Sequence, residues 1–274
     1  MRRTASSLAS LLLFLGALSI LSNIHSVGAS GTIYIRFDGS IEPATPNILT
    51  FDNTTYVLTN DIYEGIVIQR SNITLDGKGH MLKGSEIGAG LLLSGGSSVT
   101  IKNMTISDFL WGIFIESPRN NISGNNIAGS MYGIIINSAY NTISNNAISG
   151  SETGKAIHCY WGSATTIIDN VIENGIYLRG NRHKISGNRI TRSGIICDAS
   201  SGNIIQRNLI FACPYAGITL SSMHAYNNLI VENEIIHCTS GVNLVEAENT
   251  TFWHNNLINN THQVSGHRYT AIWD

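Results

Sequence analysis

The chain alternates short apolar runs with polar turns, and it does so in a repeating unit. Ile-Ser-x-Asn-x-Ile occupies residues 122–127 and again residues 143–148. One asparagine per unit continues this pattern, and each lies between apolar residues at the third position before it and the second position after it. The asparagines of this series are Asn125, Asn146, Asn170, Asn188, Asn208, Asn233 and Asn255. The repeat indicates a solenoid built from coils of roughly 22 residues.

A second phrase follows in each unit: a small residue, an apolar residue, any residue, and another apolar residue. Gly133-Ile134 and Gly175-Ile176 begin two of these phrases. Two β-rich runs per unit, separated by Asn, Gly and Ser turns, favour a parallel β-helix. A leucine-rich horseshoe has a similar period but requires leucine at fixed positions and a helical segment in each unit, whereas isoleucine dominates here. We therefore predict an all-β fold, a single-stranded parallel β-helix of about nine coils.

Stacking of coils explains why the chain repeats itself. Equivalent positions of successive coils lie about 4.8 Å apart, so isoleucine contacts isoleucine inside and asparagine contacts asparagine at the turn. Asparagine suits this turn because it tolerates left-handed backbone geometry and because its amide can bond to the coils above and below. Inward residues such as Ile136 and Ile176 contribute roughly 1.5–3 kcal/mol each, and aspartate at either position is expected to unfold several coils.

Residues 1–65 follow a different pattern. A basic start, an apolar run and a small-residue cleavage motif predict a signal peptide at residues 1–29. The apolar run is shorter than the roughly 20 residues of a membrane span and no later stretch is long enough, so we predict no transmembrane segment in the mature chain. Residues 30–65 are predicted to form an N-terminal strand and cap region, and residues 66–274 the β-helix.

Charged residues are scarce. Only 12% of residues are Asp, Glu, Lys or Arg, so Asn, Ser, Thr and Gly must supply the polar surface. The formal net charge is −2, and it becomes more negative when Arg2 and Arg3 leave with the signal peptide. The rest of the chain has no basic cluster, which argues against nucleic acid as a partner. We predict a secreted, extracellular or cell-surface protein that is a monomer.

Several stretches resemble right-handed parallel β-helix proteins of the NosD type, within the superfamily of carbohydrate-binding and sugar-hydrolase β-helices that have the pectin-lyase-like fold. These stretches are IVIQRSNITLDGKGHMLKG (66–84), VTIKNMTISDFLWGIFI (99–115), and the coils ISGNNI (122–127) and ISGNRI (185–190). The resemblance covers about 60–270 and implies a right-handed helix. The lead-in TIYIRFDGSIEP resembles exported archaeal β-helix proteins whose chains continue past a phrase like Trp273-Asp274, which implies a chain truncated before its C-terminal cap.

Function in a β-helix is expected on outward positions and loops. Counted from the small residue of each unit, three consecutive coils place His158 and Tyr160, Tyr177 and Arg179, and Asp198 on one outer face. Stacking would bring these side chains within about 10 Å of each other. A Tyr and His pair with Arg and Asp nearby is suited to proton abstraction beside a sugar carboxylate that the arginine binds, as β-helix polysaccharide lyases and epimerases would do. We call these five residues the outer cluster.

The outer cluster also has two simpler interpretations. The aromatic faces of Tyr160, Trp161 and Tyr177 could stack on sugar rings and bind carbohydrate without chemistry. Alternatively, Arg179 and Asp198 form an ordinary cross-strand ion pair, and the aromatic residues cover an exposed sheet face.

Four cysteines complete the candidate residues. Cys159 and Cys197 fall on equivalent inward positions two coils apart, too far to bridge, and are predicted to fill the core. Cys213 and Cys238 each lie at the fifth position after the asparagine of adjacent coils, so they are a disulfide candidate in an exported protein. The NosD resemblance implies copper as a competing use, with His237 beside the thiols. Since the chain has no His-rich or Met-rich tract, we predict no metal site and no cofactor.

Together these observations predict a non-catalytic exported protein that binds a polysaccharide or cell-surface glycan, or forms part of a cell-surface structure. One alternative is a polysaccharide lyase, epimerase or hydrolase that acts on acidic glycans through the outer cluster. The other alternative, implied by the resemblance, is a NosD-like periplasmic protein for copper binding and maturation.

Overall fold

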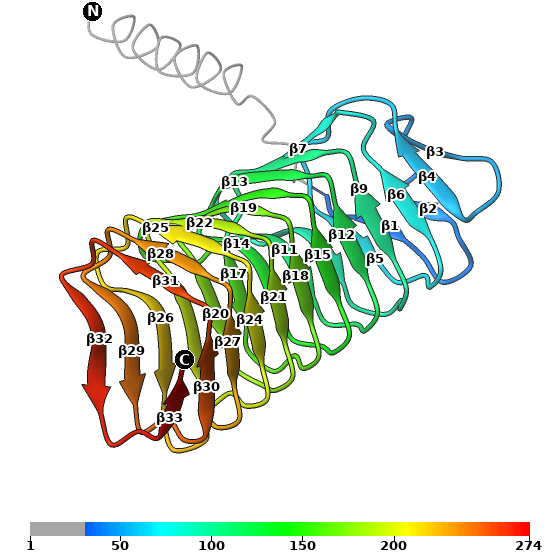
Figure 1. The fold of residues 1–274 in the computed structure, drawn as a ribbon. Coiled ribbons are helices and arrows are strands. Elements are labelled where there is room, and N and C mark those ends of the chain that lie inside the picture. Colours follow the sequence, from blue (N-terminus) through cyan, green and yellow to red (C-terminus); the bar gives the residue numbers. More distant parts are fainter. Residues whose placement is uncertain (1–30) are drawn as a thin grey trace, which may run out of the picture. The chain divides into compact units, whose positions relative to one another are not determined.

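The computed structural model describes residues 31–274, and the predicted signal peptide lies outside the described residues. Residues 32–274 form one compact unit. In this unit the chain passes through three sheets in turn, and each pass adds one strand to each sheet (Figure 1). We call them sheets A, B and C. The all-β parallel β-helix predicted from the repeat is confirmed.

Sheet A carries the strands that begin with the small-residue phrase. Within residues 31–274 it has 12 strands, in the order β2 (Ile41–Glu42), β1 (Ile33–Ile35), β5 (Ile66–Ile68), β8 (Ala89–Leu93), β11 (Trp111–Ile115), β14 (Tyr132–Ile136), β17 (Ile157–Cys159), β20 (Ile176–Leu178), β23 (Ile195–Asp198), β26 (Ala216–Ser221), β29 (Ser240–Val245) and β32 (His262–His267). From β5 to β32 these strands mark ten successive coils of the described chain.

Sheets B and C carry the strands before and after the repeated asparagine. Sheet B runs β3 (Ile48–Thr50), β4 (Thr55–Leu58), β6 (Thr74–Asp76), β9 (Thr100–Lys102), β12 (Asn121–Ser123), β15 (Thr142–Ser144), β18 (Thr166–Ile168), β21 (Lys184–Ser186), β24 (Ile204–Gln206), β27 (Leu229–Val231), β30 (Thr250–Trp253) and β33 (Ala271–Trp273). Sheet C runs β31 (Asn256–Ile258), β28 (Glu234–Ile236), β25 (Leu209–Phe211), β22 (Arg189–Thr191), β19 (Val171–Glu173), β16 (Ala147–Gly150), β13 (Asn126–Ser130), β10 (Thr105–Ser107) and β7 (Met81–Lys83).

The segment predicted as a cap contains the antiparallel pairs of the described chain. β1 pairs with β2 and β3 pairs with β4 in antiparallel fashion, while β1 and β4 also join β5 and β6 in parallel. Because β2 and β3 stand at the ends of their sheets, they extend the first coil with strands of opposite direction. Its role as a cap stays a prediction.

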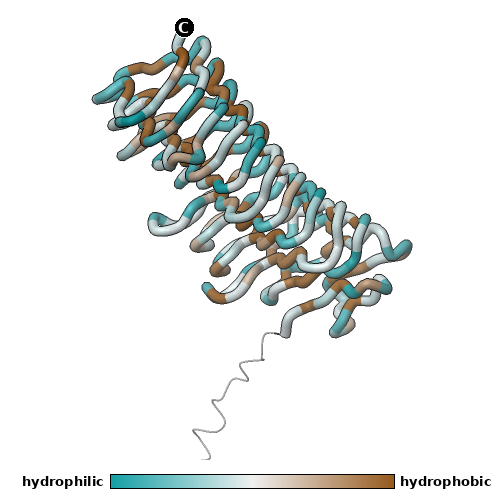
Figure 2. The backbone as a smooth tube through the Cα atoms, turned by 90° about the horizontal axis from the view of Figure 1, so that it is seen from below, coloured by the Kyte–Doolittle hydropathy of each residue, from teal (hydrophilic) through white to brown (hydrophobic). Residues whose placement is uncertain are grey.

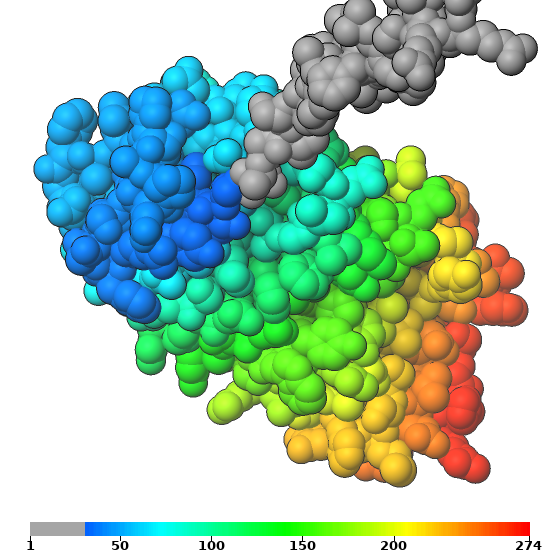
Figure 3. Space-filling model, turned by 180° about the vertical axis from the view of Figure 1, so that it is seen from behind, coloured from blue at the N-terminus to red at the C-terminus, as the bar shows by residue number. Residues whose placement is uncertain are grey.

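Apolar side chains of equivalent positions form continuous columns inside the coils. Ile157, Ile176 and Ile195 are direct partners in sheet A and are fully buried. In Figure 2, apolar stretches recur at matching places in successive coils, and in the space-filling view of Figure 3 the coils follow each other in chain order without interruption. Cys159 and Cys197 lie in the same sheet, buried as predicted. Among residues 31–274, no helix has the length and apolarity that crossing a membrane requires.

The repeated asparagine forms a buried ladder at the turn between sheets B and C. The backbone N–H and the side-chain Nδ2 of Asn146 both donate to Oδ1 of Asn170, at 2.9 and 3.0 Å. Nδ2 of Asn146 also donates to the carbonyl oxygens of Ile122 and Ser144, each at 2.9 Å. The same bonds recur from coil to coil, so the predicted bonding of each amide to its neighbouring coils is confirmed.

The predicted backbone geometry of the ladder asparagine is wrong. The left-handed residue is the one directly before it: φ is 54° at Asn145 and 55° at Asp169, which precede Asn146 and Asn170. The ladder asparagine must direct its own N–H along the stack toward the next amide oxygen. The preceding residue therefore makes the bend.

A second ladder, which the sequence analysis missed, lies at the turn between sheets A and B. The N–H of Asn120 donates to Oδ1 of Asn141 at 2.9 Å, and the N–H of Asn203 donates to Oδ1 of Asn228 at 3.0 Å. Its sequence signal is an asparagine at the second position before the inward isoleucine of sheet B. His183 replaces asparagine in one coil: its N–H donates to Oδ1 of Asn203 at 2.9 Å.

Candidate functional site

The outer cluster lies on and directly after β17, β20 and β23, which are neighbours in sheet A. His158 is paired with Tyr177 across β17 and β20. Tyr160, Arg179 and Asp198 lie at the next outward position of these coils on the same face, because side chains alternate along a strand. The structure therefore brings all five predicted residues together on the exterior of sheet A.

Asp198 is the centre of the polar contacts in this cluster. Its Oδ2 accepts a hydrogen bond from the Tyr177 hydroxyl at 2.5 Å and one from Nε of Arg179 at 3.0 Å. Burial, reinforced by the bond to Asp198, raises the pKa of Tyr177 to about 12. Tyr177 consequently keeps its proton at neutral pH, and the charge of Arg179 is compensated within the protein.

His158 is held by aromatic rings. Its ring stacks on Tyr160 with centroids 4.7 Å apart and an interplanar angle of 13°. The rings of Tyr177 and Tyr132 lie 4.6 and 5.4 Å away at tilted angles. Neither ring nitrogen of His158 has a hydrogen-bond partner within the described part of the chain.

The charge state of His158 follows from this environment. Burial lowers the pKa of His158 to about 4, and the positive charges of Lys155 and Arg179 act in the same direction. The imidazole is therefore neutral at physiological pH and is a weak base. This arrangement favours stacking of rings over transfer of protons.

Trp161 extends the aromatic surface away from the sheet. Its ring lies 6.2 Å from that of Tyr160, and 74% of Trp161 is exposed, against 42% of Tyr160. Apolar ring faces that reach solvent beside polar groups are typical of sugar-binding surfaces. We call Tyr132, His158, Tyr160, Trp161 and Tyr177 the aromatic platform.

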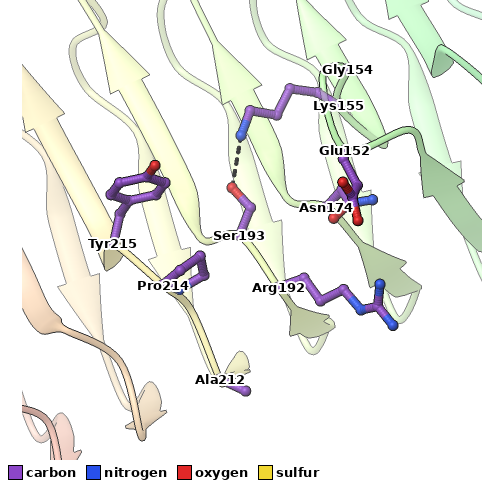
Figure 4. A pocket seen from close by; sticks show the side chains of 9 residues that line it. All are labelled: Glu152, Gly154, Lys155, Asn174, Arg192, Ser193, Ala212, Pro214 and Tyr215. Carbon is purple, nitrogen blue, oxygen red and sulfur yellow. Dashed lines mark hydrogen bonds between the residues drawn. The ribbon is translucent and has the colours of Figure 1, made fainter.

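A pocket that the sequence analysis did not find lies at the turns between sheets C and A. Six residues separate β16 from β17 and four separate β25 from β26, whereas the coils between them have only two and three. The two long turns thus project on either side of two short ones and leave a cavity of about 350 Å³ (Figure 4). We call it the corner pocket, lined by Glu152, Gly154, Lys155, Asn174, Arg192, Ser193, Ala212, Pro214 and Tyr215.

Lys155 dominates the electrostatics of the corner pocket. Its Nζ donates to Oγ of Ser193 at 2.7 Å (Figure 4), and within residues 31–274 no carboxylate lies within ion-pair distance of it. Burial lowers the pKa of Lys155. Arg192 differs, because its Nε lies 2.7 Å from Oε1 of Glu173.

The sequence does carry a signal for this pocket. Successive ladder asparagines are separated by 24 positions from Asn146 to Asn170, by 18 and 20 in the next two coils, and by 25 from Asn208 to Asn233. Since the turn between sheets B and C has constant length, part of this variation arises between sheets C and A, where the pocket forms.

Cys213 and Cys238 lie side by side at the same corner of adjacent coils. Both are free thiols in the structure and are buried, with 2% and 3% exposure. The Cys213 thiol donates to the carbonyl oxygen of Phe211 at 3.8 Å, and the Cys238 thiol donates to that of Ile236 at 3.5 Å. The interaction between the two thiols lowers the pKa of Cys238 to about 7 and raises that of Cys213. Their adjacency matches the sequence analysis, while the disulfide stays a prediction. His237 lies beside them in the chain and is exposed.

The fold and this surface define the class of protein: a right-handed parallel β-helix with an aromatic outer face. The family model described as periplasmic copper-binding protein (NosD) matches residues 137–274, and one described as right-handed beta helix region matches residues 89–175. Because the first match spans half of the sequence, the chain belongs to the NosD family. No curated protein matches the chain.

Solved structures share the fold at low sequence identity. An alginate lyase from Paenibacillus sp. str. FPU-7 is 13% identical, with a TM-score of 0.52 over 87% of this chain and 99% of that one. The A-module of the mannuronan C-5 epimerase from Azotobacter vinelandii is 12% identical, with a TM-score of 0.54 over 79% and 78%. The Dettilon tailspike protein is 13% identical, with a TM-score of 0.56 over 86% and 68%. At such identities the likeness concerns the fold alone.

Proposed function

We propose that this chain is an exported β-helix protein that binds a polysaccharide or cell-surface glycan on the outer face of sheet A, without catalysing a reaction. The observation that carries the proposal is the aromatic platform, in which Tyr160 and the largely exposed Trp161 present ring faces beside the hydrogen-bonding groups of Asp198 and Arg179. Such a surface suits sugar rings, which have apolar faces and hydroxyl edges.

The contacts of the outer cluster support binding over catalysis. A lyase or epimerase requires a base for the sugar proton and a cation for its carboxylate. The Tyr177 hydroxyl donates a hydrogen bond to Asp198, Arg179 is compensated by the same carboxylate, and neutral His158 is a weak base. Tyr160 remains as the candidate acid or base of an enzyme. Full activity of a Tyr160→Phe variant would exclude it from that role.

The test measures binding of the purified chain to a panel of neutral and anionic polysaccharides by isothermal titration calorimetry, with ultraviolet absorbance to detect unsaturated products. We expect binding without product. Trp161→Ala should weaken it about tenfold, equal to about 1.4 kcal/mol. The matched control is Trp253→Ala, since Trp253 is 50% exposed on the outer face of sheet B. Equal affinities of both variants, or release of product, would reject the proposal.

Export and a monomeric state belong to the same proposal. The predicted signal peptide at residues 1–29 and the periplasmic description of the family support export. We expect the N-terminus of the exported protein to begin near Ser30, which N-terminal sequencing would establish. Size-exclusion chromatography with light scattering tests the monomer.

Copper binding is the second candidate function, and the thiol pair is the observation that favours it. Two adjacent thiols, one with its pKa lowered to about 7, fit a soft monovalent metal such as Cu(I), which thiolates prefer. They border a shallow depression of about 490 Å³. Within residues 31–274, however, no group of three or more His, Cys, Asp or Glu side chains could share a metal ion. The fit is therefore limited to two sulfur ligands.

The copper candidate predicts one Cu(I) per chain that resists dialysis and gives a thiolate-to-metal absorption band. A chain with Cys213→Ser and Cys238→Ser should lose both signals, whereas Cys197→Ala, which removes a buried core thiol, should keep them. Loss of metal from the wild-type chain on dialysis would remove copper binding as a function.

A further inference from the structure

We infer that the corner pocket is a subsite for the carboxylate of an acidic sugar, with Lys155 as its cation and Tyr215 as its stacking face. The inference rests on the proposed polysaccharide binding and adds to it the class of sugar. It assigns a role to residues outside the outer cluster, some of which lie in the turn that also contains Cys213.

The shape of the corner pocket fits one sugar unit with its neighbours. The cavity of about 350 Å³ lies within the range of small-ligand sites. Its floor is formed by the short turns at Asn174 and Ser193, and its walls are the long turns at Glu152 and Tyr215 (Figure 4). The walls are three coils apart, which is about 14 Å at one strand spacing per coil.

The charge of Lys155, which no carboxylate of the described chain compensates, is the feature that indicates an anionic ligand. Several other basic side chains of the described coils have carboxylate partners: Lys83 pairs with Asp108 at 3.6 Å, and Arg207 pairs with Glu232 at 2.6 Å. Lys184 has no such pair but is exposed to solvent. Lys155 is half-buried, yet its bonded partner is the neutral Ser193 hydroxyl. A half-buried ammonium without a counter-charge is costly, and an anion supplied by a ligand would stabilise it.

The other lining residues favour a singly charged sugar. Asn174 donates its Nδ2 to the carbonyl oxygen of Gly150 at 2.6 Å, so its Oδ1 is available to accept a sugar hydroxyl. Tyr215 is 82% exposed and presents a ring face at the wall. Glu152 at the opposite wall can accept hydroxyls and repels a second negative charge. A uronate carboxylate therefore fits better than a phosphate group.

The corner pocket and the aromatic platform belong to the same strands. Lys155 lies in the turn that leads into β17, and its charge contributes to the lowered pKa of His158. Residues 155 and 158 are about 10 Å apart along an extended strand. A glycan held in the pocket by its carboxylate can thus continue across the platform toward Trp161.

The experiment compares a uronate oligosaccharide with its carboxyl-reduced form, titrated into the full chain by calorimetry at low salt. We expect the wild-type chain to bind the acidic form at least about tenfold more tightly. Lys155→Gln should abolish this preference. Tyr215→Ala should weaken both forms. Lys184→Gln is the matched control, because Lys184 is an exposed lysine of sheet B.

The outcomes separate this inference from the proposed function. If the wild-type chain binds the reduced and acidic forms equally, or if Lys155→Gln keeps the preference, the pocket assignment is wrong while polysaccharide binding stands. If neither form nor any polysaccharide binds, both proposals are wrong. Equal melting temperatures of the variants and the wild-type chain show that any loss of binding is not a loss of fold.

Discussion

The two turns on either side of sheet C differ in almost every respect. In the eight coils from β9–β10 to β30–β31, the turn between sheets B and C has two residues each time. In seven of these turns the second residue is an asparagine bonded to the neighbouring coils, and in the first it is Met104. Over the same stretch, the turn between sheets C and A has between one and six residues. This second turn contains Lys155, Cys213 and Cys238, the groups whose pKa values are shifted there.

The difference shows how a solenoid separates the turns that stabilise it from the turns that are free to vary. A turn whose amides bond to the coils above and below cannot change length without breaking its hydrogen bonds to both neighbouring coils. A turn that is bonded less regularly can grow or shrink, and differences between adjacent coils then create a pocket. Regular positions are therefore informative about the fold, and irregular positions indicate where a candidate site can form.

The strongest way to break the regular part is to charge its core. Ile176→Asp places a carboxylate in a fully buried column between Ile157 and Ile195, where it has no partner. We expect several coils around this position to unfold, because the substitution should lower the free energy of unfolding by more than about 4 kcal/mol. Circular dichroism and limited proteolysis measure it. The control Ile204→Asp, at an outward position of β24, should cost less than about 1 kcal/mol.

A smaller effect is expected from interrupting the asparagine ladder. Asn170→Ala removes the acceptor for two donors of Asn146 and the donor to the carbonyl oxygens of Ile143 and Ile168. Because several buried groups lose their hydrogen-bond partners, we expect the free energy of unfolding, measured with urea, to fall by about 3 kcal/mol. Asn126→Ala, at an exposed position of β13, is the matched control, and a similar loss there would contradict a special role for the ladder.

The smallest of these effects concerns the one histidine that the described chain has in the second ladder. Burial lowers the pKa of His183 to about 4, below its unfolded value of about 6.5, so the folded state favours the neutral ring. Its contribution to stability is complete above about pH 6.5 and falls as the pH drops toward 4. His183→Asn should retain the ladder bond to Asn203 and abolish this pH dependence.

Urea unfolding at two pH values measures the effect of His183. We expect the wild-type chain to lose about 2 kcal/mol more than the His183→Asn variant between pH 7 and pH 5, because the unfolded histidine takes up a proton that the folded one does not. If the free energy of unfolding depends on pH equally in the two chains, His183 is not the source of the pH dependence.

Much of the fold could be predicted from the sequence because the same contacts recur in each coil. The isoleucine columns, the asparagine ladder and the adjacency of Cys213 to Cys238 all follow from counting positions along a repeat. The positive φ before the ladder asparagine could not be read this way, since Gly, Asn, Asp, Arg, Glu and His all occupy that position.

The candidate site was only partly predictable. Counting placed the outer cluster on one face, but not the bond that joins Tyr177 to Asp198, because side-chain directions depend on packing. The corner pocket was missed, although the unequal intervals between the ladder asparagines indicate turns of different length at its position. The constant positions define the repeat, whereas the pocket arises from the turn lengths that change between Lys155 and Tyr215.

The most direct test of this account is the thermal unfolding of two chains that differ only in where one extra glycine is inserted. Between Gly187 and Asn188, in the constant turn, the insertion should lower the melting temperature by about 10 °C or more, because about 4 kcal/mol of ladder bonding is lost. Between Pro214 and Tyr215, in the variable turn, it should change the melting temperature by no more than about 2 °C. Equal decreases for the two insertions would contradict the separation of a structural turn from a binding turn.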